Sequence, residues 1–248
     1  MSDLTEDAFL GGRLRLRQPR KGFRSGMDAM LLAASIPARP GESALELGCG
    51  AGAAILALGA RVPGLALSGL ELQPPYAALA RANAALNALP LEVLEGDVAA
   101  PPPGLRDRAF AHVLLNPPYY DRAASTPAAD PGRDIAHGGP VPLAAWLALA
   151  ARRLRPGGTL SVIQRAARLP EVLAALPATL GSPEVLPLPP RDGQPAATVL
   201  LRARKGGRTP FRLLAPLALH DGPAGPDGKD FAPWAVAVLR DGAPLLWR

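Results

Sequence analysis

Apolar segments of two lengths alternate along most of the chain. Short apolar runs bounded by glycine, proline or polar residues predict buried strands at 43–48, 65–72, 91–97, 109–118 and 159–165. Longer apolar runs predict helices at 51–62, 74–88, 142–154 and 169–181. This alternation indicates βαβ units, a mostly parallel sheet and right-handed crossovers between its strands.

The N-terminal part has a different pattern. Between residues 12 and 18, Leu14 and Leu16 stand between arginines, and this period of two predicts a short strand or hairpin with a basic, solvated face. The apolar segment 26–36 then predicts a helix that ends near Pro37.

The C-terminal part predicts the edge of the sheet. Two strands with no helix between them, at 183–190 and 197–206, indicate a closing antiparallel hairpin. Residues 221–248 are rich in glycine and proline, and we expect them to form a loop packed on the domain. The expected organisation is one domain spanning 1–248, with an N-terminal extension at 1–40, an α/β core at 41–220 and a tail at 221–248.

Composition excludes several classes of protein. Hydrophobic residues make up 48% and charged residues 19% of the 248 residues, as in folded proteins rather than disordered ones. No apolar run reaches the roughly 18 residues of a membrane helix, and the acidic start of the chain is unlike a signal peptide. A single cysteine, Cys49, excludes an intramolecular disulfide, and the three scattered histidines do not have metal-ligand spacing. We therefore expect a cytoplasmic protein without a metal or a membrane partner.

The net charge of +6 comes mainly from arginine. Codon bias is one explanation, but the basic residues cluster, as in an electrostatic footprint for nucleic acid. The candidate RNA-binding residues are Arg13, Arg15, Arg17, Arg20, Lys21 and Arg24 in the first cluster, and Arg202, Arg204, Lys205 and Arg208, with Arg212 nearby, in the second.

A glycine-rich turn follows the first core strand. Gly48, Gly50 and Gly52 stand between a predicted strand and a predicted helix, where glycine allows a tight turn and a close approach to a ligand. Glu46 precedes the turn, and Glu71 ends the next strand, where a carboxylate can accept both hydroxyls of a ribose. A solvated strand-end charge is the alternative explanation for Glu71.

Two further strands also end on polar residues. Asp97 ends the third core strand and Asn116 the fourth, so that four successive strands bring candidate ligand-binding groups to one edge of the sheet. The segment Asn116-Pro117-Pro118-Tyr119 combines a side-chain amide, a stiffened backbone and an aromatic ring. A proline-stiffened strand end with surface tyrosines is the alternative reading.

The succession "LELGCGAG", "LEL", "EGD" and "NPPY" resembles the class I S-adenosylmethionine-dependent methyltransferases, and in particular those that methylate a planar nitrogen. The resemblance implies a Rossmann-like α/β fold: a mostly parallel seven-stranded sheet with an antiparallel terminal strand. It also implies that Gly48, Cys49, Gly50 and Gly52 hold the methionine part of S-adenosylmethionine, Glu71 its ribose and Asp97 its adenine. The remaining residues of the expected cofactor site are Glu46, Leu72, Val98 and Asn116.

The motif has a chemical rationale. An exocyclic amine conjugated to a ring is a poor nucleophile because its lone pair is delocalised. The Asn116 side-chain oxygen can accept one N–H, and the Pro117 carbonyl, stiffened by Pro117 and Pro118, can accept the other. The nitrogen lone pair would then face the sulfonium methyl, and the Tyr119 ring would stack on the target base. We expect these four residues to be catalytic.

Most of residues 6–222, including both basic flanks but not the loop 121–136, resembles bacterial tRNA (adenine-N6)-methyltransferases that act on valine tRNA beside the anticodon. The glutamine methyltransferases of release factors share the core motif but carry a helical domain before the glycine turn, where only about 42 basic-rich residues stand here. Guanine-N2 RNA methyltransferases, which usually have Phe in place of Tyr119, and a non-catalytic RNA-binding protein on the same fold are further alternatives.

Four other residues have two readings each. Gly26 and Asp28 either help to close the cofactor pocket or simply begin a helix. Arg122 and Arg133 either contact RNA or lie in a solvated loop.

Overall fold

Eight strands form the central sheet of the structure, a computed structural model that describes residues 3–117, 141–222 and 230–247. The order across the sheet is β10-β8-β9-β7-β6-β3-β4-β5, and only β9 runs antiparallel to its neighbours. The strands are β3 (Ser43–Leu47), β4 (Ala66–Glu71), β5 (Leu91–Glu95), β6 (Phe110–Leu115), β7 (Leu154–Arg165), β8 (Leu180–Leu188), β9 (Thr198–Lys205) and β10 (Arg212–Leu213). The expected mostly parallel sheet with an antiparallel strand is confirmed, and the two-residue β10 adds an eighth strand at its edge.

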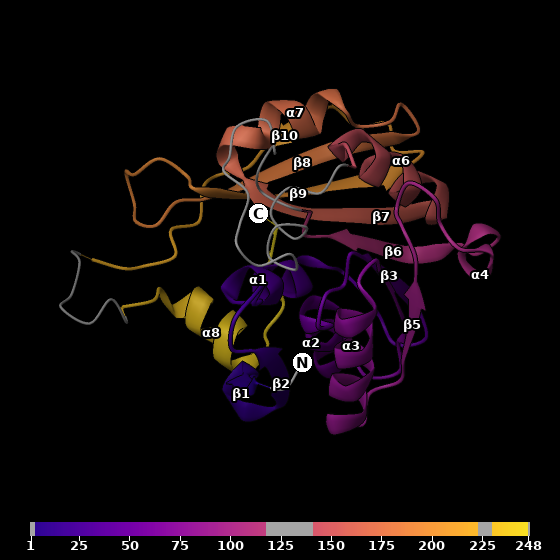
Figure 1. Cartoon of the computed structure of the whole chain (residues 1–248). Coiled ribbons are helices and arrows are strands. Elements are labelled where there is room, and N and C mark those ends of the chain that lie inside the picture. The colour runs from indigo at the N-terminus through magenta and orange to yellow at the C-terminus, as the bar shows by residue number, and fades with distance from the viewer. Residues whose placement is uncertain (1–2, 118–140, 223–229, 248) are drawn as a thin grey trace.

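Helices cover both faces of this sheet (Figure 1). One core lies between the sheet and the helices α1, α2 and α8, and the other lies between the sheet and α4, α6 and α7. Helix α3 packs on β4 and β5, on the same face as α2. The helices are α1 (Met27–Ser35), α2 (Ala53–Arg61), α3 (Pro74–Leu86), α4 (Pro103–Arg106), α6 (Leu143–Arg153), α7 (Leu169–Ala174) and α8 (Pro233–Asp241), with short 3₁₀ turns η1 (Leu10–Gly12) and η3 (Ala166–Arg168). None of the helices in the described part of the chain has the length and apolar character of a membrane span.

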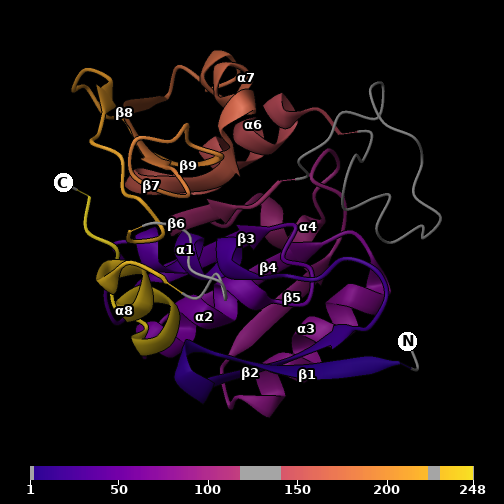
Figure 2. The same ribbon diagram turned by 90° about the vertical axis from the view of Figure 1, so that its left-hand side faces the viewer.

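The N-terminal extension forms a separate two-stranded sheet beneath α2 and α3 (Figure 2). Strand β2 (Leu14–Pro19) buries Leu14 and Leu16 and exposes Arg15 and Arg17, which confirms the predicted alternation. Its antiparallel partner β1 (Leu4–Phe9) completes the hairpin that was one of the two readings, but β1 lies outside the segment 12–18 on which that reading rested. Period-two patterning is visible where leucines alternate with arginines, whereas β1 has no fully buried residue and carries the acidic Glu6 and Asp7.

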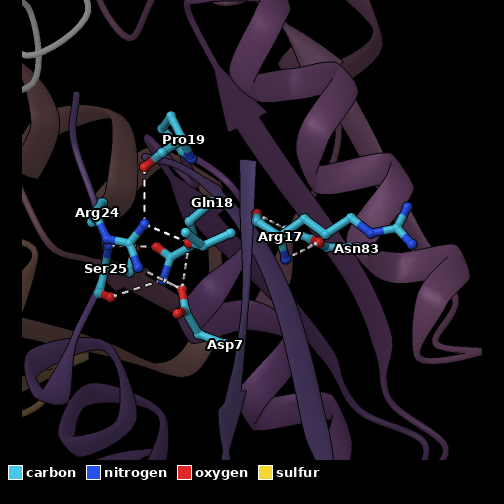
Figure 3. Close-up of polar contacts among 8 residues, drawn as sticks. Asp7, Arg17, Gln18, Pro19, Arg24, Ser25 and Asn83 are labelled. Atoms are coloured by element: carbon cyan, nitrogen blue, oxygen red, sulfur yellow. Dashed lines mark hydrogen bonds and ion pairs between the residues drawn. The ribbon is translucent and has the colours of Figure 1, made fainter. Parts of the chain in front are cut away.

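Two asparagines, Asn83 in α3 and Asn87 directly after the last residue of that helix, attach β2 to the core. The Asn83 amide accepts the N–H of Arg17 at 2.7 Å and donates to the carbonyl of Arg17 at 3.0 Å, as a neighbouring strand would do (Figure 3). One turn later, Asn87 makes the same pair of contacts with Arg15, at 2.9 and 2.7 Å. Because residues i and i+4 lie on one face of a helix, the two amides satisfy alternate residues of the strand.

The tail was predicted wrongly. Residues 221–248 were expected to be a loop, but α8 forms within them and packs against α1. The helix buries Ala235 and Val238 from a segment whose glycines and prolines lie mostly outside it. The predicted helix at 169–181 is shorter than expected, because α7 ends at Ala174, shortly before Pro177.

Candidate active site

Four strands bring candidate residues to one edge of the sheet. Gly48 follows β3 directly, Glu71 ends β4, Asp97 lies two residues after β5, and Asn116 follows β6. Strand β3 lies between β4 and β6, so the chain moves outward through β4 and β5 and then returns to the other side of β3. This is the topological switch point at which open α/β sheets bind ligands.

The turn between β3 and α2 requires glycine at three positions. Gly48, Gly50 and Gly52 all have positive φ, of 68°, 54° and 86°. The N–H groups of Gly48 and Cys49 both donate to the carbonyl of Leu70, at 2.8 and 3.0 Å, which joins the turn to β4. A Cβ on Gly48 would also lie 2.7 Å from the ring of Trp146, a residue of α6 that sequence reasoning missed.

Glu71 joins the glycine turn to the start of α3. One carboxylate oxygen accepts the N–H of Gly50 at 2.8 Å, and the other accepts the N–H of Gln73 at 2.9 Å. Burial raises the pKa of this carboxyl above its ordinary value, and the main-chain hydrogen bonds oppose that shift. Glu71 is therefore held in place by its contacts and is not a solvated strand-end charge.

The side chains of Glu46 and Cys49 are both buried. The Glu46 carboxylate accepts the N–H of Ile55 at 2.9 Å and so caps the first turn of α2, because Gly52 has no side chain to do so. Burial, with a smaller contribution from the charge of Glu71, raises the pKa of Glu46 well above its ordinary value. The Cys49 thiol is buried, and a Cβ on Gly69 would lie only 2.7 Å from its sulfur. Cys49 thus faces the site only through its main chain.

The residues after β4 and β5 differ in exposure. Leu72 is an exposed apolar side chain beside Glu71, whereas the Val98 side chain is buried in the core. Asp97 accepts the N–H of Ala99 at 2.8 Å, which folds the chain back after β5. Asp97 and Leu72 can therefore offer side chains to a ligand, while Val98 can offer only its main chain.

The Asn-Pro-Pro-Tyr segment begins within the described residues. Asn116 is half-buried and Pro117 is buried at the end of β6. The carbonyl of Pro117 accepts a hydrogen bond from Nε2 of Gln164, at 3.5 Å. Pro118 and Tyr119 lie outside the described residues, as do Arg122 and Arg133.

The N-terminal segment reaches the glycine turn. The Tyr76 hydroxyl accepts the N–H of Phe23 at 3.0 Å and donates to its carbonyl at 3.3 Å. The Phe23 ring approaches Gly50, to whose ideal Cβ position it comes within 3.9 Å, and it packs against the cluster formed by Ala51, Tyr76 and Leu79. Gly26 precedes α1 and Asp28 lies in its first turn, so both are part of the segment that follows this contact.

Sequence reasoning missed Phe23, Tyr76, Trp146 and Gln164, because each of them contacts a residue that is distant in the sequence. No spacing rule links these four residues to the motifs.

The two basic clusters lie in different places. In the ladder between β7 and β9, Arg204 pairs with Thr159, the first residue of β7 that pairs with β9. Thr198 pairs with Arg165, the last residue of β7. Because β9 runs antiparallel, Arg204 and Lys205 lie toward the edge opposite the candidate active site. Their side chains donate to the main-chain carbonyls of Gly157 and Leu154, at 3.1 and 2.6 Å.

The first cluster is largely paired with the acidic residues of β1. Glu6 contacts both Arg15 and Arg17, and the Asp3–Arg20 and Asp7–Arg24 pairs are 2.8 and 2.7 Å long. Arg24 also donates to the Pro19 carbonyl, within a group that includes Gln18 and Ser25 (Figure 3). Lys21 is exposed and makes no ion pair with the described residues.

Comparison with known proteins then assigns a family. The family described as Methyltransferase small domain matches residues 27–186, more than half of the chain. The chain belongs to this family. It is a methyltransferase, and its methyl donor is S-adenosylmethionine.

Several relatives of this family are similar to the chain. It is 29% identical over 175 residues to a tRNA1(Val) (adenine(37)-N6)-methyltransferase of Porphyromonas gingivalis, which covers 67% of this chain and 68% of that protein. It is 36% identical over 130 residues to a release factor glutamine methyltransferase of Deinococcus radiodurans, which covers 47% of this chain and 43% of that protein. The chain thus spans less than half the length of the second relative.

Solved structures share the fold. A predicted O-methyltransferase from Agrobacterium tumefaciens is 29% identical, with a TM-score of 0.70 over 89% of this chain and 98% of that chain. A T. thermophilus 16S rRNA N2 methyltransferase, solved in complex with AdoMet and guanosine, is 21% identical, with a TM-score of 0.56 over 82% of this chain and 50% of that chain.

The residues at the sheet edge fit S-adenosylmethionine. Each oxygen of Glu71 accepts one main-chain N–H, and each can accept a second donor, so the carboxylate can still bind the hydroxyls of a ribose. The main chain at Gly50 is open to close approach, because among the described residues only the Phe23 ring lies within 4 Å of its ideal Cβ position, whereas Gly48 and Gly52 face Trp146 and Leu56. The described residues do not bring three His, Cys, Asp or Glu side chains together as a metal site.

Proposed function

We propose that the chain transfers a methyl group to the exocyclic N6 amine of an adenine in tRNA. The observation that carries this proposal is the position of Asn116, which follows β6 directly and so faces the glycine turn across the switch point between β6 and β3. A side-chain amide at that position can accept an N–H of a planar amine beside the methyl donor.

In the proposed reaction, the protein binds and orients the amine. S-adenosylmethionine, when bound, would supply an electrophilic methyl group, whose bond to the sulfonium sulfur breaks as the bond to nitrogen forms, so that S-adenosylhomocysteine is the leaving group. Asn116 Oδ1 accepts one N–H of the amine and the Pro117 carbonyl accepts the other, which directs the nitrogen lone pair toward the methyl group. After transfer, the nitrogen is acidic and releases its proton to water, so no strong general base is needed. The rate enhancement comes mainly from positioning. Tyr119 stacks on the base in this proposal.

The relatives favour an RNA substrate. The tRNA1(Val) methyltransferase matches 67% of the chain, against 47% for the glutamine methyltransferase. The higher identity to the second relative, 36%, makes a glutamine amide the second candidate substrate. Both nitrogens are planar, and the same two acceptors would orient either one.

We propose that tRNA contacts the basic cluster of the N-terminal extension. Arg20 and Lys21 lie between β2 and Phe23, and therefore close to the glycine turn. The extension has six basic and three acidic residues among its first 24, so it keeps a positive charge despite its ion pairs. Exposed pairs of this kind are worth little, and phosphates can compete for them. We also propose that residues 1–248 act as one domain in the cytoplasm.

The test is methyl transfer from labelled S-adenosylmethionine to unmodified tRNA transcripts and, separately, to a protein extract. RNA products are digested and scored for N6-methyladenosine and N2-methylguanosine. N6-methyladenosine that disappears with Asn116→Ala, in a variant that still binds S-adenosylmethionine, is the expected result. Label only in protein would replace adenine by glutamine as the substrate. An Asn116→Ala variant with nearly full activity would refute the assigned role.

A further inference from the structure

Gln164 stands beside the Pro117 carbonyl where the backbone ladder between β6 and β7 is interrupted. Leu115 of β6 pairs with Val162 of β7, so Pro117 and Gln164, two residues further along each strand, are also neighbours. Proline has no N–H, and the two strands cannot continue their hydrogen bonding through it. The Gln164 side chain spans this gap: it is 1% exposed, and its Nε2 donates to the Pro117 carbonyl at 3.5 Å.

The orientation of the Gln164 amide is determined by its other contact. Its oxygen Oε1 accepts the N–H of Arg165 at 2.8 Å. Because a main-chain N–H can only donate, the oxygen must face Arg165, and the NH₂ group must face Pro117. Pairing of Gln164 with Val199 of β9 fixes the backbone on the other side. The donor next to the Pro117 carbonyl is therefore held rigidly.

We propose that Gln164 is a positioning residue for methyl transfer: it directs the Pro117 carbonyl toward the amine that is methylated. The proposal rests on the proposed function, in which this carbonyl accepts one N–H of the substrate. A carbonyl oxygen has two lone pairs, so the bond from Gln164 leaves one for the substrate. The bond is long and weak, and it restrains the direction of the carbonyl without consuming its acceptor capacity.

A purely structural role would be to satisfy a buried carbonyl. Loss of that contact would lower stability and affect catalysis only through the amount of folded protein. A positioning role instead lowers kcat for the folded enzyme, since a displacement of about 1 Å can cost about a hundredfold in rate. The two roles are separated by kcat per folded molecule.

The decisive variant is Gln164→Glu. The introduced side chain has the same shape and can still accept the Arg165 N–H, but when ionised it cannot donate to Pro117. Gln164→Met is the matched control that has the same length and loses both contacts. At a pH high enough to ionise the introduced carboxyl, we expect kcat to fall by about tenfold or more in both variants, with the dissociation constant of S-adenosylmethionine within about twofold of wild type.

The pH dependence adds a signature that a structural role does not produce. A buried carboxyl has a raised pKa, and its protonated form donates a hydrogen bond. The relative kcat of Gln164→Glu, compared with wild type at each pH, should therefore recover as the pH falls, whereas that of Gln164→Met should stay constant.

These outcomes distinguish the two proposals. Wild-type enzyme is first assayed with tRNA, with guanine-containing RNA and with a glutamine peptide. If it methylates no planar nitrogen, the proposed function is refuted, and the role of Gln164 with it. If wild type is active and both variants keep kcat within about twofold per folded molecule, the positioning role alone is refuted.

Discussion

Replacing Asn83 by alanine tests how far the N-terminal hairpin depends on α3. Asn83 is 0% exposed, and besides its two contacts with Arg17 it donates to the carbonyl of Ala51, at 2.9 Å, in the glycine turn. Asn83→Ala removes all three hydrogen bonds and leaves three main-chain groups without these partners. The variant therefore weakens the attachment of both β2 and the glycine turn to α3.

The expected loss follows from the number of bonds and their burial. A hydrogen bond contributes about 1 kcal/mol to the free energy of unfolding, and a buried group left unsatisfied costs about 1–3 kcal/mol. The buried Ala51 carbonyl contributes about 1–3 kcal/mol and each of the two part-buried groups of Arg17 about 1 kcal/mol, which gives an expected loss of about 3–5 kcal/mol. Asn87→Ala is the matched control: Asn87 also makes three hydrogen bonds to main-chain atoms, of Arg15 and Asn83, but those to Arg15 are exposed and water can replace them. We expect a loss of about 1 kcal/mol or less there.

Urea denaturation followed by circular dichroism measures both losses, and titration with S-adenosylmethionine measures the effect on the turn. Asn83→Ala should raise the dissociation constant of S-adenosylmethionine, because the carbonyl of Ala51 in the glycine turn loses its hydrogen bond. Asn87→Ala should leave that constant unchanged. Equal losses of stability in the two variants, within about 0.5 kcal/mol, would contradict the assignment of burial as the cause. Unchanged cofactor affinity in a destabilised Asn83→Ala variant would show that the hairpin and the turn are independent.

Three other variants test separate features. Because the pKa of Glu46 is raised above 4.5 in the folded state, its stabilising contribution is present below pH 4.5 and is lost as the pH rises through the raised value. Glu46→Gln, which keeps the Ile55 contact, should thus be more stable than wild type at pH 8, with an advantage that shrinks by at most about 1.4 kcal/mol per pH unit on acidification. A difference in stability that stays constant with pH in urea melts would contradict this. Gly69→Ala should lower the free energy of unfolding by about 1–3 kcal/mol, because the added Cβ contacts the Cys49 sulfur. Adding Cys49→Ala should restore part of that stability in the same melts, and no recovery would exclude the contact as the cause. In filter binding, Lys21→Ala should weaken tRNA binding and reduce its salt dependence more than Arg204→Ala, and the reverse order would place the RNA at the opposite edge of the sheet.

The strand ends could be predicted from the sequence because their signals are local. Gly48, Glu71, Asp97 and Asn116 each follow a short apolar run, and in a parallel sheet all such ends meet at one edge. The expected parallel order required no knowledge of distant contacts. The gathering of these candidate residues at one edge of the sheet was therefore predicted before any tertiary contact was known.

The contacts that hold the site could not be predicted in this way. Asn83 and Asn87 look like ordinary polar residues on the surface of a helix, but their partners in β2 lie 66 and 72 residues away. The second basic cluster is similar: its charges are clear in the sequence, but the antiparallel direction of β9 places them toward the far edge. Sequence reasoning identifies the charge, while topology decides where it lies.

The division between core and extension bears on substrate choice. The family match covers residues 27–186 and so leaves out most of the extension. The chain resembles both a tRNA adenine methyltransferase and a release factor glutamine methyltransferase. The residues proposed to orient a planar nitrogen, Asn116 and Pro117, lie inside that range and can serve either substrate. Discrimination must therefore come from other residues, and the extension is in contact with the site through the Phe23–Tyr76 hydrogen bonds and through Asn83. An extension joined to the glycine turn through Tyr76 and Asn83 can couple substrate contact to the geometry of that turn, which a separate binding module would not do.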